Sequence, residues 1–167
     1  VLNTKDFYVN SSLSLSRNLV YNFNETLYDY GADFSQYNII ENKYVITDLA
    51  FSPGVLLNNH FEWKANKFLS FILNSKYVGK QYLDNTSNEK RVLKDFLIND
   101  FKIQTNLTNN VFNNLFFKIE INNIFNVKYS SNGYTFGYYG GMDYEVRENY
   151  FYPQATRNIM FSVSIEI

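Results

Sequence analysis

The sequence predicts an all-β fold of antiparallel strands that cross a membrane. The first observation is the segment 158–167, in which apolar residues take every odd position and mostly polar residues the even ones. Such alternation indicates a strand with one apolar and one hydrated face. The second is that other segments repeat this pattern, with small or polar residues on the second face instead of a second core. The third is that short and long connections alternate along the chain. A sheet between lipid and water has these properties.

The composition fits this class. The chain has 15 tyrosines and 16 phenylalanines, which supply nearly all of the 19% aromatic residues, and both types favour strands. No run approaches the roughly 18 apolar residues of a membrane helix, whereas a strand crosses with about 9 to 11. A net charge of -1 gives no indication of nucleic acid as a partner. The sequence contains no cysteine, which excludes disulfides, thiolate metal sites and a cysteine nucleophile.

About six crossing strands are expected, and their apolar residues share one phase. The segments are 9–21, 55–64, 67–78, 96–107, 115–125 and 158–167. The residues predicted to face lipid are Leu57, Phe61, Trp63, Leu69, Phe71, Leu73, Phe101, Ile103, Phe117, Ile119, Ile121, Ile159, Phe161, Val163 and Ile165. Arg17 lies in the outward phase, but it is near a strand end, where its charge can pair with lipid headgroup phosphates. Charges in the apolar parts of the other five segments fall in the inward phase.

The connections predict a meander with two different rims. Turns near 65–66 and 108–114 are short, whereas 22–54, 79–95 and 126–157 are long. In outer-membrane barrels the short turns face the periplasm and the long loops face outside. Loops on a rigid scaffold tend to carry recognition. We therefore expect substrate or partner contacts at five loop tyrosines, namely Tyr28, Tyr30, Tyr134, Tyr138 and Tyr139.

Six strands are too few for a closed membrane barrel. The smallest familiar barrels have eight strands, and an open edge in hydrocarbon leaves backbone groups unpaired. Either 44–51 and 134–139 supply two further crossings, or the missing strands lie elsewhere. The parity of the loops favours the second alternative, and an opening on Val1 instead of Met suggests a piece of a longer protein.

Several motifs resemble the carboxyl-terminal end of a TonB-dependent outer-membrane receptor. They are YVGKQYLDNT (77–86) followed by 87–89, NNIFN (122–126) with Tyr129, SNGYTF (131–136), YPQATRN (152–158), and DLAFSP (48–53) with His60 downstream. The resemblance covers essentially the whole chain, in the family's order and spacing. It implies that residues 1–167 are the last part of a 22-stranded barrel whose earlier strands and plug domain are absent here.

The resemblance also implies partners and a location. The protein would be an integral outer-membrane barrel in contact with lipids, with the rest of the same barrel and its plug domain, and with TonB through that plug. A surface lipoprotein or other envelope subunits are further expected partners. No cofactor, metal or catalytic residue is expected.

Some motifs have simpler structural interpretations. NNIFN (122–126) is expected to end a strand, and the single histidine, His60, to be a hydrogen-bonded wall residue. The acidic residues of 84–95 match no calcium-loop spacing. Residues 137–141 lack the Lys-Ser/Thr ending of a phosphate-binding loop, and an external loop is expected there.

Three functions are compatible with these observations. The first is energy-coupled import of a scarce solute by plug gating, and the second is a structural or interaction platform in a larger envelope complex. The third, a surface enzyme, is disfavoured because no Ser-His-Asp order, His cluster or carboxylate pair is found.

Overall fold

The structure is a computed structural model and describes residues 1–107, 113–141 and 144–166. Every helix or strand within these ranges is a β-strand, which confirms the all-β prediction. No helix among the described residues is long and apolar enough to cross a membrane. The strands are β1 (Leu2–Asn3), β2 (Phe7–Leu15), β3 (Leu19–Asp29), β4 (Asn38–Asp48), β5 (Val55–Lys64), β6 (Leu69–Val78), β7 (Gln81–Tyr82), β8 (Val92–Leu93), β9 (Phe96–Leu107), β10 (Asn114–Asn122), β11 (Ser130–Tyr139), β12 (Glu145–Pro153) and β13 (Asn158–Glu166).

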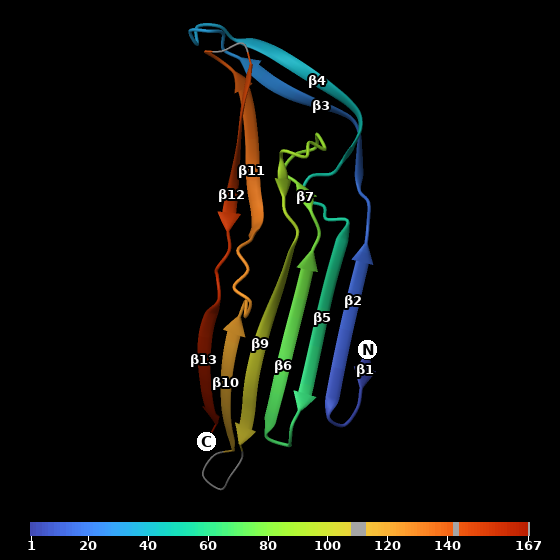
Figure 1. Cartoon of the computed structure of the whole chain (residues 1–167), viewed down its shortest axis with the longest axis vertical. Coiled ribbons are helices and arrows are strands. Elements are labelled where there is room, and N and C mark those ends of the chain that lie inside the picture. Colours follow the sequence, from blue (N-terminus) through green and yellow to red (C-terminus); the bar gives the residue numbers. More distant parts are fainter. Residues whose placement is uncertain (108–112, 142–143, 167) are drawn as a thin grey trace.

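Six long strands form one antiparallel sheet in the order β2-β5-β6-β9-β10-β13, and the short β1 pairs with the start of β2 (Figure 1). The predicted segments 55–64 and 96–107 coincide with β5 and β9, and three others overlap β6, β10 and β13. The chain therefore folds as three long hairpins, which we name hairpin A (7–64), hairpin B (69–107) and hairpin C (114–166). The sheet is open, with β13 at one edge and β1 and β2 at the other.

The first predicted strand, 9–21, is wrong in its bounds. β2 ends at Leu15, and the chain bends before β3 starts at Leu19. The Ser16 amide donates to the Gly54 carbonyl at 3.0 Å, and the Asn18 side-chain amide donates to the Ser52 hydroxyl at 2.6 Å. Polar side chains stabilise this bend, and the alternation of apolar and polar residues in the sequence does not reveal it.

The long connections contain hairpin tips instead of irregular loops. β3 and β4 form the tip of hairpin A, β7 and β8 that of hairpin B, and β11 and β12 that of hairpin C. β11 also pairs in parallel with β3, which joins the tips of A and C into a four-stranded sheet. Residues 44–48 and 134–139 lie in this second sheet, so they do not add strands to the large one. In Figure 1 the short turns and the carboxyl terminus lie at one end of the large sheet and the tips at the other.

The register gives the large sheet two chemically different faces. Every cross-strand pair between its six long strands joins two odd-numbered or two even-numbered residues. All the residues predicted to face lipid therefore lie on one face. One row across the sheet contains Phe7, Trp63, Phe71, Ile103, Ile119 and Phe161.

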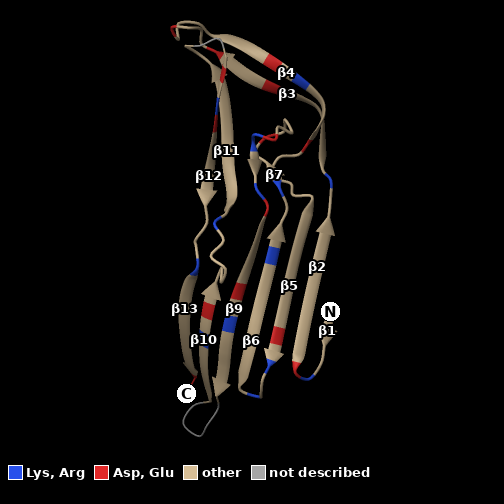
Figure 2. Cartoon of the chain, in the orientation of Figure 1, with Lys and Arg blue, Asp and Glu red and all other residues tan. Residues whose placement is uncertain are grey.

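All charged residues of the six strands lie on the opposite face, because each has an even number. Figure 2 shows such charges in β5, β6, β9 and β10. Lys102 and Glu120 form an ion pair across neighbouring strands, with Lys102 Nζ 2.6 Å from one carboxylate oxygen of Glu120. Lys118 Nζ lies 3.0 Å from the other oxygen. The charged side chains of the large sheet thus lie on its polar face, and none lies on its apolar face.

Within the described ranges no second layer covers the apolar face. Phe161 is 74% exposed, and Ile159, Val163 and Ile165 are exposed by more than half. The buried apolar side chains lie mainly near the tips, and they include Leu27, Val78, Leu83, Leu93 and Phe96. The described residues thus build their core where the three hairpins meet and not between two sheets.

Candidate binding site where the hairpin tips meet

The tip of hairpin B, residues 79–95, lies between the tips of hairpins A and C. Leu93 is its most buried side chain, at 1% exposed, and the ring of Phe96 lies 4.4 Å from that of Tyr129 of hairpin C. The Phe51 amide of hairpin A donates to the Tyr82 carbonyl at 3.0 Å, and Asn149 of hairpin C donates to the Lys90 carbonyl at 3.0 Å. Backbone and side-chain bonds therefore hold this tip from both sides.

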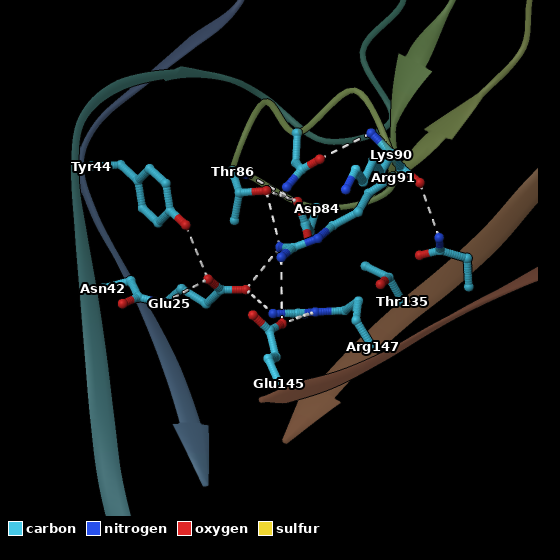
Figure 3. Close-up of polar contacts among 12 residues, drawn as sticks. Glu25, Asn42, Tyr44, Asp84, Thr86, Lys90, Arg91, Thr135, Glu145 and Arg147 are labelled. Atoms are coloured by element: carbon cyan, nitrogen blue, oxygen red, sulfur yellow. Dashed lines mark hydrogen bonds and ion pairs between the residues drawn. The ribbon is translucent and has the colours of Figure 1, made fainter. Parts of the chain in front are cut away.

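Arg91 is the central side chain of the junction (Figure 3). It is 6% exposed, and its Nη1 lies 2.9 Å from Glu25 Oε1 of hairpin A and 2.9 Å from Asp84 Oδ2 of its own hairpin. Its Nη2 lies 3.5 Å from Glu145 Oε1 of hairpin C. One guanidinium thus contacts carboxylates of all three hairpins.

A tight turn places Arg91 there. Asp84 Oδ1 accepts from the amide and the hydroxyl of Thr86, at 3.1 and 2.5 Å. Ser87 has a left-handed φ of 53°, and the Arg91 amide donates to the Asn88 carbonyl at 2.9 Å. Asx turns of this kind are typical of Asp and Asn in loops.

Glu25 projects from β3 on the same side as Leu27 and is 8% exposed. Its Oε1 accepts from Arg91 at 2.9 Å and from Arg147 Nη2 at 2.6 Å. Its Oε2 accepts from Asn42 at 3.3 Å and from the Tyr44 hydroxyl at 3.1 Å. A carboxylate has about four lone-pair sites, so the hydrogen-bonding capacity of Glu25 is filled.

The electrostatics follow from this arrangement. Burial alone would raise the pKa of Glu25, but hydrogen bonds from Arg147 and Asn42 and the charges of both arginines outweigh burial and lower it. Burial alone would lower the pKa of Arg91, but its ion pair with Asp84 and the charges of Glu25 and Glu145 raise it. Both groups are therefore ionised at neutral pH. Buried charges are retained only when they are paired in this way.

Arg147 of β12 completes the cluster. Its Nε donates to Glu145 Oε1, and its side chain crosses Gly137 of the paired strand β11. A Cβ at Gly137 would lie 2.5 Å from the Arg147 Cζ and 2.8 Å from Glu145 Oε1. Glycine at this position therefore leaves room for the guanidinium to reach Glu25. We name Glu25, Asp84, Arg91, Glu145 and Arg147 the ionic cluster.

Three of the predicted contact tyrosines lie together. Tyr138 pairs with Tyr28 where β11 meets β3, and the Tyr30 ring lies 6.1 Å from the Tyr138 ring and 6.4 Å from the Tyr28 ring. The Tyr37 ring lies 5.4 Å from that of Tyr28. A cavity of about 500 Å³ lies beside these groups. Its lining includes three of the tyrosines and three members of the ionic cluster, namely Tyr28, Tyr30, Tyr138, Glu25, Asp84 and Arg147.

The other two tyrosines lie elsewhere on β11. Tyr134 stacks on Tyr150, with ring centroids 5.0 Å apart, in an exposed row of aromatics on hairpin C. Tyr139 contributes its backbone carbonyl, which accepts from the Tyr30 amide at 2.8 Å. The structure differs from the expected loops in one respect, since four of the five tyrosines, Tyr28, Tyr134, Tyr138 and Tyr139, are strand residues of the hairpin tips, and only Tyr30 follows a strand end. The external loop expected over 137–141 is wrong for 137–139.

The ionic cluster was not foreseen from the sequence. The one available signal was Glu25, a charge in phase with the apolar Phe23 and Leu27 of the same strand. The sequence gives no comparable indication for Arg91 and Arg147, because polar and apolar residues around them do not alternate regularly.

The remaining motifs have structural roles. His60 Nδ1 lies 2.7 Å from Asn74 Oδ1 of the neighbouring strand. Asn123, in NNIFN (122–126), has a left-handed φ of 52°, is buried, and exchanges hydrogen bonds with the Val127 backbone at 2.8 and 2.9 Å. No group of three potential metal ligands occurs within the described ranges.

Comparisons with known proteins supply no relative. No family model, no curated protein and no solved structure matches the chain. The functional argument therefore depends on the geometry of the chain itself.

Proposed function

We propose that this chain forms the last strands of the barrel of a TonB-dependent outer-membrane receptor. The receptor binds a scarce solute at its external hairpin tips and admits it when the plug domain is pulled through TonB. This chain then performs no covalent chemistry. The observation that carries the proposal is an apolar face that continues across six strands and contains no charged residue, and that no other described part of the chain covers.

The dimensions of that face support a membrane position. β5 and β6 have ten residues each. At about 3.3 Å per residue such a strand is about 33 Å long, and a tilt of about 40° reduces its height to about 25 Å. This equals the height of about 25 Å that the apolar band of outer-membrane barrels has.

The open edges support a larger barrel. β13 pairs only with β10, and β2 pairs with β5 and, over two residues, with β1. Unpaired backbone groups in hydrocarbon cost several kcal/mol each, so further strands must pair with both edges. The resemblance of the motifs sets the proposed total at 22 strands and adds a plug domain.

The proposal predicts a difference between two neighbouring substitutions in β13. Phe161→Lys places a charge on the apolar face, where a lysine at the membrane midplane costs about 2 to 4 kcal/mol. Ser162→Lys places the same charge on the polar face, opposite Lys118. We expect the first variant to lose most of its outer-membrane insertion, measured by heat-modifiable gel mobility, and the second to keep it. Equal tolerance of the two would contradict the membrane position.

A platform within an envelope complex is the second candidate function. The contact of all three tips with Arg91 favours it, because a rigid external surface suits a permanent partner such as a surface lipoprotein. Purification from the outer membrane separates the two functions. A receptor is expected to bind and import a solute, whereas a platform is expected to copurify with partner subunits that fill its interior and to import nothing.

A further inference from the structure

The cavity at the hairpin junction lies where two strands separate. β3 and β11 pair only at Tyr28–Tyr138 and Asp29–Tyr139, and Asp84 and Thr86 of hairpin B line the cavity together with residues of both strands. The cavity has about 500 Å³, within the roughly 300 to 1,000 Å³ of small-molecule sites. Figure 3 shows the ionic cluster with Thr86 and Thr135 beside it, and Glu25, Asp84 and Arg147 of this cluster form the charged base of the cavity.

The base of the cavity disfavours a cationic ligand. Its most buried carboxylate, Glu25, already accepts four hydrogen bonds, two at each oxygen. Asp84 accepts from Thr86 twice and from Arg91. A ligand ammonium would have to displace a buried arginine from its partner and leave that charge unpaired, which is strongly unfavourable.

The base also disfavours an anionic ligand. The ionic cluster contains three carboxylates and two guanidiniums, so its formal charge is -1. Arg91 directs its Nη1 at Glu25, Asp84 and Thr86, and Arg147 directs Nε and Nη2 at Glu145 and Glu25. Both arginines are thus engaged by protein acceptors, and the surplus carboxylate repels a second anion.

The rest of the lining combines hydroxyl groups with aromatic rings. Thr26, Tyr28, Tyr30 and Tyr138 each carry a hydroxyl, which can both donate and accept, whereas the Thr135 hydroxyl already donates to the Glu148 carbonyl at 3.1 Å. Tyr30 meets Tyr138 edge to face at an interplanar angle of 65°, so the two rings bound the opening in different directions. Such a wall suits a neutral ligand with many hydroxyls and with C–H faces that lie against rings.

We propose that this cavity binds a neutral polyhydroxylated ligand, a sugar ring of an uncharged glycan. The inference rests on the proposed receptor function and gives the chemical class of its solute. Tyr28, Tyr30 and Tyr138 lie against the sugar ring, the threonine and tyrosine hydroxyls bind its hydroxyls, and the ionic cluster holds the two walls at a fixed separation.

The test uses the full-length receptor in detergent micelles on a printed array of neutral, acidic and amino-sugar glycans. We expect signals confined to neutral glycans. Tyr30→Ala should weaken the strongest of these signals at least tenfold, and Tyr30→Phe should weaken it less, because it keeps the ring. Tyr21→Ala is the control, since Tyr21 is an exposed tyrosine of β3, the strand that Tyr30 follows, and lies outside the cavity. It should bind as the wild type does.

Three results would overturn the assignment: no glycan bound, acidic or amino sugars bound as well as neutral ones, or unchanged binding by Tyr30→Ala. Membrane insertion of the same preparations is measured in parallel by gel mobility. A receptor that inserts and imports a charged solute would refute the sugar site and leave the receptor function standing. Failure of the wild-type protein to insert would refute the receptor function itself.

Discussion

Replacing Arg91 tests whether the ionic cluster holds the three hairpin tips together. Arg91→Met removes the guanidinium and keeps a side chain of similar length. It leaves Glu25 with one arginine instead of two, and Asp84 with none. Because Arg91 is 6% exposed, the loss belongs to the buried class, in which removing one partner of an ion pair costs about 3 to 5 kcal/mol.

Lys80→Met is the matched control. Lys80 Nζ lies 2.6 Å from Glu89 Oε1 on the same tip of hairpin B, but both side chains are largely exposed. Exposed ion pairs contribute about 0 to 1 kcal/mol, so the shorter distance does not make this pair the stronger one. The two variants remove the same formal charge from the same loop and differ in burial.

Hydrogen exchange of the detergent-solubilised protein measures the effect. At about 1.4 kcal/mol per tenfold change, Arg91→Met should accelerate exchange of the β3, β4, β11 and β12 amides by roughly 100-fold to a few thousand-fold. Lys80→Met should accelerate it less than about fivefold, and the amides of β6 and β9 should be unaffected by either change. Similar acceleration by both variants, or none by Arg91→Met, would refute the role given to the cluster.

Three further predictions concern the same junction and its neighbours. The pKa of Glu25 lies below its ordinary 4.5. The contribution of Glu25 to stability is therefore complete above pH 4.5 and is lost as the pH falls through the lower pKa of the folded state. Hydrogen exchange at the tips should accelerate on acidification below pH 4.5 and should not accelerate between pH 6 and 8. Gly137→Ala should displace the guanidinium of Arg147 and cost about 1 to 3 kcal/mol, measured as faster exchange in β11 and β12, whereas exchange equal to the wild type would show that Arg147 can move freely. Asn123→Ala removes the bonds of a buried side chain to Val127, which leaves half-buried backbone groups of Val127 unpaired and should cost about 1 to 3 kcal/mol in urea unfolding. A change below 0.5 kcal/mol, roughly the size of a neutral surface substitution, would contradict this.

The large sheet was largely predictable from the sequence because the pattern that defines each of its strands lies within about ten consecutive residues. A strand between two different environments must alternate, and short turns preserve that phase from one strand to the next. The segments 55–64 and 96–107 were therefore predicted to the residue. The first segment failed at its end, because Asn18 continues the polar phase past the point where the chain bends away.

The junction was not predictable by the same reasoning. Glu25 and Arg147 are 122 residues apart in the chain, and their contact depends on how far the tips of A and C lean toward each other. The sequence places Tyr28 and Tyr138 in two separate long connections, and they meet because β3 and β11 pair in parallel over two residues. No local pattern specifies so short a contact between strands that are distant in the chain.

A nitroxide scan of β13 in lipid bilayers tests the central claim most directly. Labels are attached one at a time at positions 159 to 165, and their collisions with oxygen, which concentrates in acyl chains, are compared with collisions with a water-soluble nickel complex. The apolar face predicts high oxygen access at Ile159, Phe161, Val163 and Ile165 and low access at the even positions between them, with the opposite order for nickel. Oxygen and nickel access without a period of two, or nickel access at all seven positions, would contradict the membrane-spanning sheet.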